Sequence, residues 1–347
     1  MKKISEIMQN RWRGFNLQGL FVSPESKDIN LFYNLQYYPE EKFKIILDWG
    51  FNYVRLPLSY RCWSSAEDPY TMKEEVLEKL DEAIYFGEKY GLHIDLGFHR
   101  APGYCVNDDE DEKFDLWTDS DAQKAFVYQF TEIAKRYKNY DNDKVTFNFI
   151  NEPKDTVSVA NYAKVFTMVQ EAVEAVTPGR IFTVDGHGWA HIPPADLMEV
   201  EKKNVIYSCR GYEPAGLTHY LFSKLYQDTV PTWPNALRCV RVTPREYIRY
   251  DYKKLRANFE MWKSVCDIYG QRFFCGEFGC NSNTPHDVTL AWLEDLLSIF
   301  KELNIGWAMW NLCGTFGVMD SGRKDVEYED YYGYKLDRKM LDIMMKY

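Results

Sequence analysis

Short apolar runs alternate with longer amphipathic stretches along most of the chain. Eight of the runs are rich in β-branched and aromatic residues and are bounded by turn residues, a pattern typical of buried strands. We expect these strands at residues 13–19, 53–58, 93–98, 145–150, 181–185, 205–209, 271–279 and 306–312. Four of the intervening stretches carry apolar side chains on one helical face, which predicts helices at residues 72–90, 121–137, 160–176 and 287–303.

The order of these elements predicts the fold. Repeated alternation of a strand and a helix implies a parallel sheet, and eight repeats imply that the sheet closes into a (β/α)8 barrel of the TIM type. A doubly wound open sheet is the alternative, but the phosphate-binding Gly-x-Gly-x-x-Gly pattern is absent after the first strand.

No repeat, low-complexity run or linker interrupts the chain, so we expect a single catalytic domain over residues 1–347. The longest irregular segment is 213–250, after the sixth strand, and it is rich in aromatic residues and proline. A loop of this length in a compact domain is usually functional or disordered. We predict an ordered insertion that forms one wall of a cleft; the alternative is a hydrophobic cluster with no role in ligand binding.

Composition narrows the class of partner. The net charge of −10 argues against nucleic acid or an anionic membrane, because both require a basic face. Aromatic residues make up 16% of the chain, and a surplus of aromatic rings suits a groove that packs against the apolar faces of sugar rings. We therefore expect a neutral substrate and no nucleic-acid or membrane partner. We also expect a monomer.

The cysteines and histidines give no sign of a metal or a cofactor. None of the 8 cysteines forms a Cys-x-x-Cys pair, and the 6 histidines include no His-Glu-x-x-His motif. In a chain of this size, buried free thiols are expected rather than disulfides. The N-terminus has no apolar signal-peptide core, so we expect either a cytoplasmic protein or a secreted one whose signal has been removed.

Two glutamates stand at the ends of two predicted strands. The fourth strand leads into Asn151-Glu152-Pro153, where the proline cannot donate a ladder hydrogen bond and biases Glu152 towards an extended backbone. We therefore expect this strand to stop at Glu152. The seventh strand carries Glu277 between Gly276 and Gly279, which let other groups approach the backbone closely.

Asn-Glu-Pro alone is equally consistent with an ordinary turn, but the two carboxylates together are what glycoside hydrolysis requires. With these motifs, the sequence resembles the retaining glycoside hydrolases of the large cellulase family (family 5, clan A). The resemblance runs from Gly14 to Arg323 and rests on motifs at seven strand ends. It implies that Glu152 is the general acid/base and Glu277 the nucleophile, with their carboxyl groups about 5–5.5 Å apart.

The resemblance also implies supporting roles at other strand ends. Arg55 would hold Glu277 in its charged form, Asn151 would donate to the 2-hydroxyl of the sugar, and His99 would bind another sugar hydroxyl. Tyr212 would hydrogen-bond the nucleophile, and Trp310 would form the floor of the cleavage subsite. For Arg55 the alternative is a surface ion pair, and His99 and Trp310 could each be structural.

Four further residues are singled out. We expect Asn16, after the first strand, to be structural or to support the residues that touch the substrate. Tyr104, Trp189 and Trp233 are candidate platforms for more distant sugar units.

One position departs from the family pattern. The family usually has His-x-Tyr after the sixth strand, and here Arg210 takes the place of the histidine. An arginine beside Glu152 would lower the pKa of that carboxyl and weaken it as an acid. Either Arg210 points away, or a further acid such as Glu213 balances it, or the specificity is unusual.

These observations predict a hydrolase that cleaves β-linked glucan by double displacement, most simply an endo-β-1,4-glucanase. Strand-end residues do not separate this activity from β-mannanase, glucomannanase, or exo-acting β-glucosidase and β-1,3-glucanase, so these remain open. A non-catalytic carbohydrate-binding barrel is a further alternative, but it predicts the loss of one glutamate, and both are present.

Overall fold

Eight parallel strands close into a barrel in the computed structural model, which describes residues 1–23, 35–107, 112–199, 204–222, 229–234, 236–239 and 247–347. Each strand pairs with its neighbours in parallel, and the pairing of β2 with β3 and of β1 with β11 completes the ring. In chain order the strands are β1 (Arg13–Asn16), β2 (Tyr53–Ser59), β3 (His93–Ala101), β5 (Val145–Asn148), β6 (Phe182–Asp185), β7 (Val205–Gly211), β10 (Phe273–Phe278) and β11 (Gly306–Met309).

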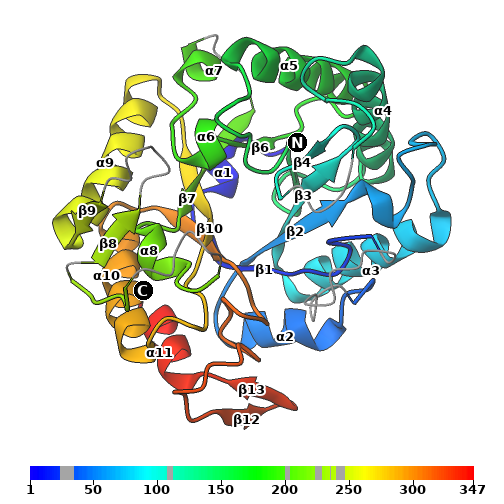
Figure 1. The fold of residues 1–347 in the computed structure, drawn as a ribbon. Coiled ribbons are helices and arrows are strands. Elements are labelled where there is room, and N and C mark those ends of the chain that lie inside the picture. The colour runs from blue at the N-terminus through cyan, green and yellow to red at the C-terminus, as the bar shows by residue number, and fades with distance from the viewer. Residues whose placement is uncertain (24–34, 108–111, 200–203, 223–228, 235, 240–246) are drawn as a thin grey trace.

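Helices surround this ring (Figure 1). The longer ones are α2 (Glu40–Asp48), α3 (Glu74–Tyr90), α4 (Ser120–Arg136), α5 (Val159–Val176), α9 (Tyr252–Ile268), α10 (His286–Glu302) and α11 (Arg338–Lys346). Short helices are α1 (Ile4–Ile7), the 3-10 turn η1 (Tyr60–Cys62), α6 (His187–Ala190), α7 (Ala195–Glu199) and α8 (Ala215–Thr218). The short strand β4 (Tyr104–Cys105) folds back on β3, and two hairpins are formed by β8 (Ala236–Cys239) with β9 (Tyr247–Tyr250) and by β12 (Glu329–Tyr331) with β13 (Tyr334–Leu336).

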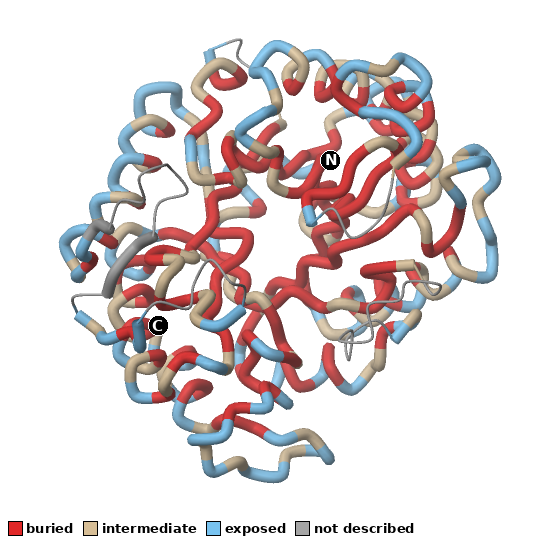
Figure 2. Tube along the Cα trace, viewed as in Figure 1, coloured by how far each residue is buried: buried red, intermediate tan, exposed pale blue. Residues whose placement is uncertain are grey.

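The two faces of each strand explain where the core lies. In β2, Val54, Leu56 and Leu58 pack outward against the helices, whereas Tyr53 and Arg55 face the inside of the barrel. Figure 2 shows this buried ring at the centre of the molecule.

A separate apolar cluster closes the N-terminal end of the barrel. Trp12 stacks on Tyr53, with ring centroids 4.9 Å apart, and on His93 at 4.6 Å, and it meets the edge of Phe274. Ile181 and its neighbours complete the cluster. With this end sealed, the carboxyl ends of the strands are left to carry the polar site, as in other barrels of this type.

The predicted (β/α)8 barrel is therefore confirmed. All eight expected strands and all four expected helices are present, with ends displaced by a few residues. Of the longer helices, α2, α9 and α11 had not been predicted. In the 213–250 segment the structure shows α8 and the β8–β9 hairpin, while residues 223–228, 235 and 240–246 lie outside the described part of the chain. The expected cleft wall, and the single domain over 1–347, stay predictions.

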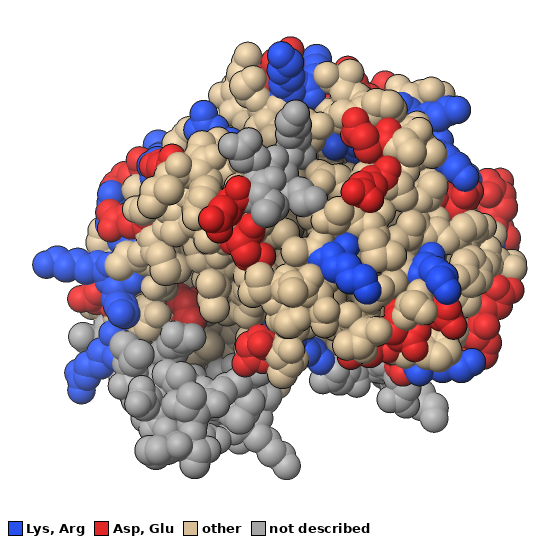
Figure 3. All heavy atoms as spheres, turned by 90° about the horizontal axis from the view of Figure 1, so that it is seen from above, with Lys and Arg blue, Asp and Glu red and all other residues tan. Residues whose placement is uncertain are grey.

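Three further features concern the surface charge, the thiols and the length of the apolar helices. The face drawn in Figure 3 carries lysine and arginine side chains interspersed with acidic ones. The seven cysteines whose side chains are described are all free, as expected. Within the described residues, no helix combines the length and the apolar character needed to cross a bilayer.

Candidate active site

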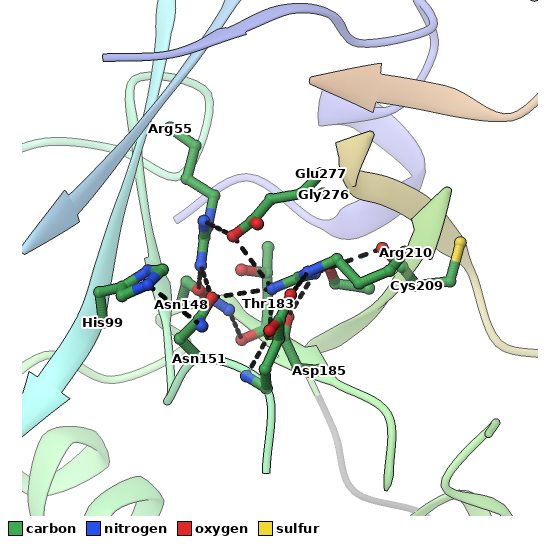
Figure 4. Close-up of polar contacts among 12 residues, drawn as sticks. Arg55, His99, Asn148, Asn151, Thr183, Asp185, Cys209, Arg210, Gly276 and Glu277 are labelled. Atoms are coloured by element: carbon green, nitrogen blue, oxygen red, sulfur yellow. Dashed lines mark hydrogen bonds and ion pairs between the residues drawn. The ribbon is translucent and has the colours of Figure 1, made fainter. Parts of the chain in front are cut away.

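Arg55 is the centre of a buried network at the carboxyl end of the barrel (Figure 4). Its Nη1 donates to Asn16 Oδ1 at 2.9 Å and to Glu277 Oε1 at 2.5 Å. Its Nε and Nη2 donate to Asn148 Oδ1, and Nη2 also donates to Asn151 Oδ1 at 2.9 Å. All five N–H groups of the guanidinium are used, so both its charge and its orientation are fixed.

Glu277 is held from two sides. Arg55 binds Oε1, and the Tyr212 hydroxyl donates to Oε2 at 3.1 Å. Glu277 is 3% exposed, so each of these contacts is made in a largely desolvated site. Burial and the nearby carboxylates of Glu277 and Glu152 raise the pKa of Tyr212, which keeps its phenol a hydrogen-bond donor.

Arg210 points into the site rather than away from it. Its Nε donates to Glu152 Oε1 at 2.7 Å, and its Nη2 lies 3.3 Å from Glu277 Oε1. The register of the sheet explains this reach, because Arg210 of β7 lies directly opposite Glu277 of β10. One guanidinium therefore contacts both glutamates that the sequence singled out, and Asn151 accepts a further hydrogen bond from it.

Asp185 supplies a balancing acid for Arg210, as one of the three alternatives required, although Glu213 was the example given there. Asp185 ends β6, is fully buried, and accepts from Arg210 Nη2 at 2.5 Å and from Nη1 at 3.3 Å. Asp185 had not been predicted as a site residue. The signal was available, because β6 and β7 are neighbouring strands and an acid at the tip of one faces an arginine at the tip of the other.

The backbone of Glu152 differs from the prediction. Strand β5 ends at Asn148, four residues earlier than expected, and Glu152 adopts a left-handed conformation with a φ of 46° rather than an extended one. Two side chains hold this turn: the Glu152 amide donates to Asp185 Oδ2 at 2.9 Å, and the Tyr104 hydroxyl donates to the Glu152 carbonyl at 2.6 Å. These tertiary contacts override the local preference set by Pro153.

The pKa of Glu152 is raised to about 7. Burial raises it most, Arg210 lowers it, as expected of an arginine beside this carboxyl, and the negative charges of Glu277 and Asp185 raise it. Of the three alternatives for Arg210, the one with a balancing acid therefore fits the site, because desolvation and the two neighbouring carboxylates outweigh the guanidinium.

His99 and Trp310 lie together on the other side of the site. Their rings stack with centroids 5.5 Å apart, and His99 Nε2 lies 3.4 Å from Asn151 Nδ2. Burial, together with Arg100, Arg55 and Arg210, lowers the pKa of His99 well below its usual range, so the imidazole is neutral. Within the described residues, its buried Nδ1 has no hydrogen-bond partner.

The three candidate platforms lie in different places. Tyr104 is 5% exposed, its hydroxyl supports Glu152, and it lines a pocket beside that turn, so its role as a platform stays a prediction. The amide of Trp189 donates to the Pro153 carbonyl, which places it beside the Glu152 turn. The indole of Trp233 donates to Asp295 of α10, and its role in binding sugar stays a prediction.

Asn16 has the structural role that was expected, since its Nδ2 donates to the Gly276 carbonyl at 3.0 Å and its Oδ1 accepts from Arg55. Asn148 completes the network and was missed by the sequence analysis. In the part of the chain that the structure describes, no cluster of three or more histidine, cysteine, aspartate or glutamate side chains is arranged to hold a metal ion.

Comparison with known proteins connects this geometry to a family. The model of the family described as cellulase (glycosyl hydrolase family 5) matches residues 10–315. This protein belongs to glycoside hydrolase family 5. It is 25% identical to endoglucanase C of Acetivibrio thermocellus over 312 residues, which cover 84% of this chain and 88% of that protein.

Two further relatives of this family 5 chain are informative. Cellodextrinase A of Ruminococcus flavefaciens is 24% identical over 275 residues, which cover 77% of this chain and 76% of that one. A solved structure described only as a glycoside hydrolase is 31% identical, covers 97% of this chain and 99% of its own, and superposes with a TM-score of 0.85. The family 5 chain is thus a glycosidase with the barrel of its relatives.

Proposed function

We propose that this glycosidase is a retaining enzyme that cleaves β-linked glucan by double displacement, with Glu277 as nucleophile and Glu152 as general acid/base. The single observation that carries the proposal is the placement of the two glutamates around one guanidinium. Because Arg210 reaches both carboxylates, they lie across a gap that one guanidinium can span, which suits direct attack better than attack through an intervening water.

The surroundings of the two glutamates suit different tasks. Glu277 is held by Arg55 and Tyr212, so its oxygens are aimed and its charge is compensated. Glu152, with a pKa raised to about 7, holds a proton near neutral pH and releases it readily. This division is what double displacement requires: the first carboxylate attacks the anomeric carbon while the second protonates the leaving oxygen.

Groups around the glutamates suit a sugar ring. Trp310 is half-buried and backed by His99, so its ring offers an apolar surface in a site otherwise lined with polar groups. His99 and Asn151, whose side chains lie 3.4 Å apart at the strand ends, would bind sugar hydroxyls in this proposal. On the side of Glu152, a pocket of about 340 Å³ lined by Tyr104, Trp117 and Lys154 offers space for the leaving-group sugars.

Among β-glucans, we favour an endo-acting β-1,4-glucanase, because endoglucanase C matches over most of both chains. The similarity to cellodextrinase A favours short β-1,4-linked oligosaccharides as the second candidate substrate. Mannan, glucomannan and β-1,3-glucan are further polymers that the family-like strand ends do not exclude.

Release of reducing sugar separates these candidates. The panel is mixed-linkage β-glucan, carboxymethylcellulose, glucomannan, mannan, laminarin and short cello-oligosaccharides, each with wild type, Glu277→Gln and Glu152→Gln. Activity on β-1,4-linked glucan that falls by about 10³-fold or more in Glu277→Gln supports the proposal. Activity on mannan alone would keep the mechanism and overturn the substrate, whereas full activity of Glu277→Gln would overturn the site.

A further inference from the structure

Arg210 is bound on every side that its guanidinium presents. Besides Glu152, Glu277 and Asp185, its Nη1 donates to Ser208 Oγ at 3.0 Å and to the Cys209 carbonyl at 3.3 Å. Its side chain has no exposed surface. A fully buried cation is retained only when its charge is matched, and here three carboxyl groups surround it.

The space behind Arg210 is also closed. Gly276 stands where any side chain would collide: an added Cβ would come within 2.4 Å of Ser208 Oγ and 3.1 Å of Arg210 Nη1. The glycine of β10, the serine of β7 and the aspartate of β6 thus form a socket that holds the guanidinium in one orientation, with Nε towards Glu152 and Nη2 towards Glu277.

The charges in this socket balance in one particular protonation state. Two guanidinium groups, Arg55 and Arg210, contact three carboxyl groups, Glu277, Asp185 and Glu152. The net charge of these five groups is zero when one of the three carboxyl groups holds a proton. Asp185 makes two hydrogen bonds to Arg210 and accepts one from a backbone amide, so Glu152, with its single bond to Arg210 Nε, is the group that keeps the proton.

We propose that Arg210, locked by Asp185, is a shared counter-ion that stays in contact with the negative charge as it moves between the two catalytic carboxyl groups. Both are positioning residues rather than catalytic ones, because neither is required to touch the substrate. The inference rests on the proposed retaining mechanism and deepens it.

The charge can be followed through the reaction. In the first step a Glu277 oxygen forms a bond to the anomeric carbon, the glycosidic C–O bond breaks, and the Glu152 proton passes to the leaving oxygen. Glu277 becomes a neutral ester and Glu152 becomes the carboxylate, so the charge has crossed from one partner of Arg210 to the other. In the second step Glu152 removes a proton from water, the water oxygen bonds to the anomeric carbon, and the bond to Glu277 breaks, which returns the charge.

Asp185 has a separate part in this arrangement. It occupies two N–H groups of Arg210 and so offsets the charge that would otherwise pull the proton from Glu152. The other titratable or charged groups facing Glu152 come from β4, the end of β7 and β10: Tyr104, Tyr212 and Glu277. Burial first of all raises the pKa of both tyrosines, so they stay neutral in the working range and leave Asp185 and Arg210 as the opposing charges that substitutions can change.

Substitutions of Asp185 and Arg210 shift the high-pH limb of kcat/KM in opposite directions. Asp185→Asn removes a negative charge near Glu152, so the loss of kcat/KM at high pH moves to lower pH by about one unit or more. Arg210→Met removes the positive charge, so that limb moves to higher pH, while the maximal kcat falls because Glu277 loses a counter-ion. Arg210→Lys keeps the charge and restores most of the wild-type limb.

The experiment measures kcat/KM against pH for two aryl β-cellobiosides, one with a poor leaving group and one with a good leaving group that needs little protonation. For Asp185→Asn at pH 7 we expect about a 10-fold loss on the poor leaving group and less than about 3-fold on the good one. The matched control is Asp81→Asn, which breaks an analogous aspartate–arginine pair with Arg136 on the outer helices and leaves both profiles unchanged.

Equal losses on both substrates with an unshifted pH limb would mean that Asp185 is merely structural, and would overturn the inference. Thermal unfolding of each variant is followed in parallel. If Arg210→Met does not fold, the pH limb and the leaving-group dependence of the isosteric Asp185→Asn variant still test the inference. Inactivity of the wild type, or full activity of Glu277→Gln, would instead overturn the proposed function, so the two failures are distinguishable.

Discussion

Arg55 supports the fold and the site at the same time, and the two contributions can be measured separately. Its five N–H groups bind Asn16, Asn148, Asn151 and Glu277, and its side chain is buried. Removing one partner of a buried ion pair costs about 3–5 kcal/mol, because the remaining charge is left uncompensated. We therefore expect Arg55→Met to lower the free energy of unfolding by about 4 kcal/mol.

This value converts into a melting temperature. Unfolding entropies near 2.1 cal/mol/K per residue give about 0.7 kcal/mol/K for a chain of 347 residues. A loss of about 4 kcal/mol then lowers Tm by about 5 °C. Arg55→Lys keeps the charge but has three donors in place of five, so it leaves at least one buried acceptor unpaired, at about 1–3 kcal/mol, and lowers Tm by about half as much.

The contribution of Arg55 to catalysis is measured by kcat/KM. Without Arg55 the nucleophile loses both its aim and its compensating charge, and we expect kcat/KM to fall by about 10²–10³-fold. Arg180 is a matched control because it is equally buried but lies at the amino end of the strands, away from the site. It donates to the backbone carbonyls of Val145, Tyr137 and Tyr140. Arg180→Met should lower Tm while kcat/KM changes by less than about 2-fold.

Calorimetry and steady-state kinetics on Arg55→Met, Arg55→Lys and Arg180→Met test both expectations. An Arg55→Met protein that melts like the wild type would show that the network does not carry the stability we assign to it. Equal loss of activity in the Arg55 and Arg180 variants would show that activity follows general destabilisation rather than the aim of Glu277.

Three further outcomes are expected. Because the pKa of Glu152 is raised to about 7, the wild-type kcat/KM falls above about pH 7 as the acid loses its proton, and a pH–rate profile that stays flat to pH 9 would contradict this. Gly276→Ala forces a methyl group within 2.4 Å of Ser208 Oγ and 3.1 Å of Arg210 Nη1, so we expect a loss of activity of about 10-fold or more with a lowered Tm; wild-type kinetics would show that the socket is not tight. Burial raises the pKa of Asp95, so the folded state binds this proton more strongly than the unfolded state, and stability falls as the pH rises above the unfolded value. The difference in Tm between Asp95→Asn and the wild type should therefore increase with pH from about 4 upward. A difference that stays constant with pH would contradict the raised pKa of Asp95.

The fold was predictable because most of its strands and helices have a recognisable local pattern of apolar residues. A run such as Tyr53-Val54-Arg55-Leu56-Pro57-Leu58 is apolar on the face that meets the helices, and its single arginine marks the inner face. Helices α2 and α9 were harder to recognise, since both carry many charged and aromatic residues among their buried positions. In α9 only Leu255, Phe259, Trp262 and Cys266 are buried, and their helical spacing becomes clear once the barrel is present to cover them.

The site was predictable as far as strand ends reveal it. Glu152, Glu277 and Arg55 come together as the order of the strands implies. The backbone conformation of Glu152 was not predictable, because its positive φ is imposed by Asp185 and Tyr104, which are distant in the sequence. Local preference before a proline gave the wrong backbone there.

The polar layer inside the barrel was also missed. Asp95 accepts hydrogen bonds from Tyr53, Thr146 and Thr183, all of which face inward below the catalytic network. Hydrophobic pattern analysis treats such strand interiors as uniformly apolar. Only the closed ring shows that the inward positions of neighbouring strands meet one another and can satisfy polar groups jointly.

The identity of the nucleophile can be established by trapping it. Incubation with a 2-deoxy-2-fluoro β-cellobioside that carries a good leaving group slows both steps, and the slower second step lets the glycosyl-enzyme accumulate for mass spectrometry of the peptides. We predict a one-to-one increase in mass by the fluorosugar, located on Glu277 and absent in Glu277→Gln. A label on another residue, or steady turnover with inversion at the anomeric carbon and no trapped species, would contradict the assignment of Glu277 and the double-displacement mechanism with it.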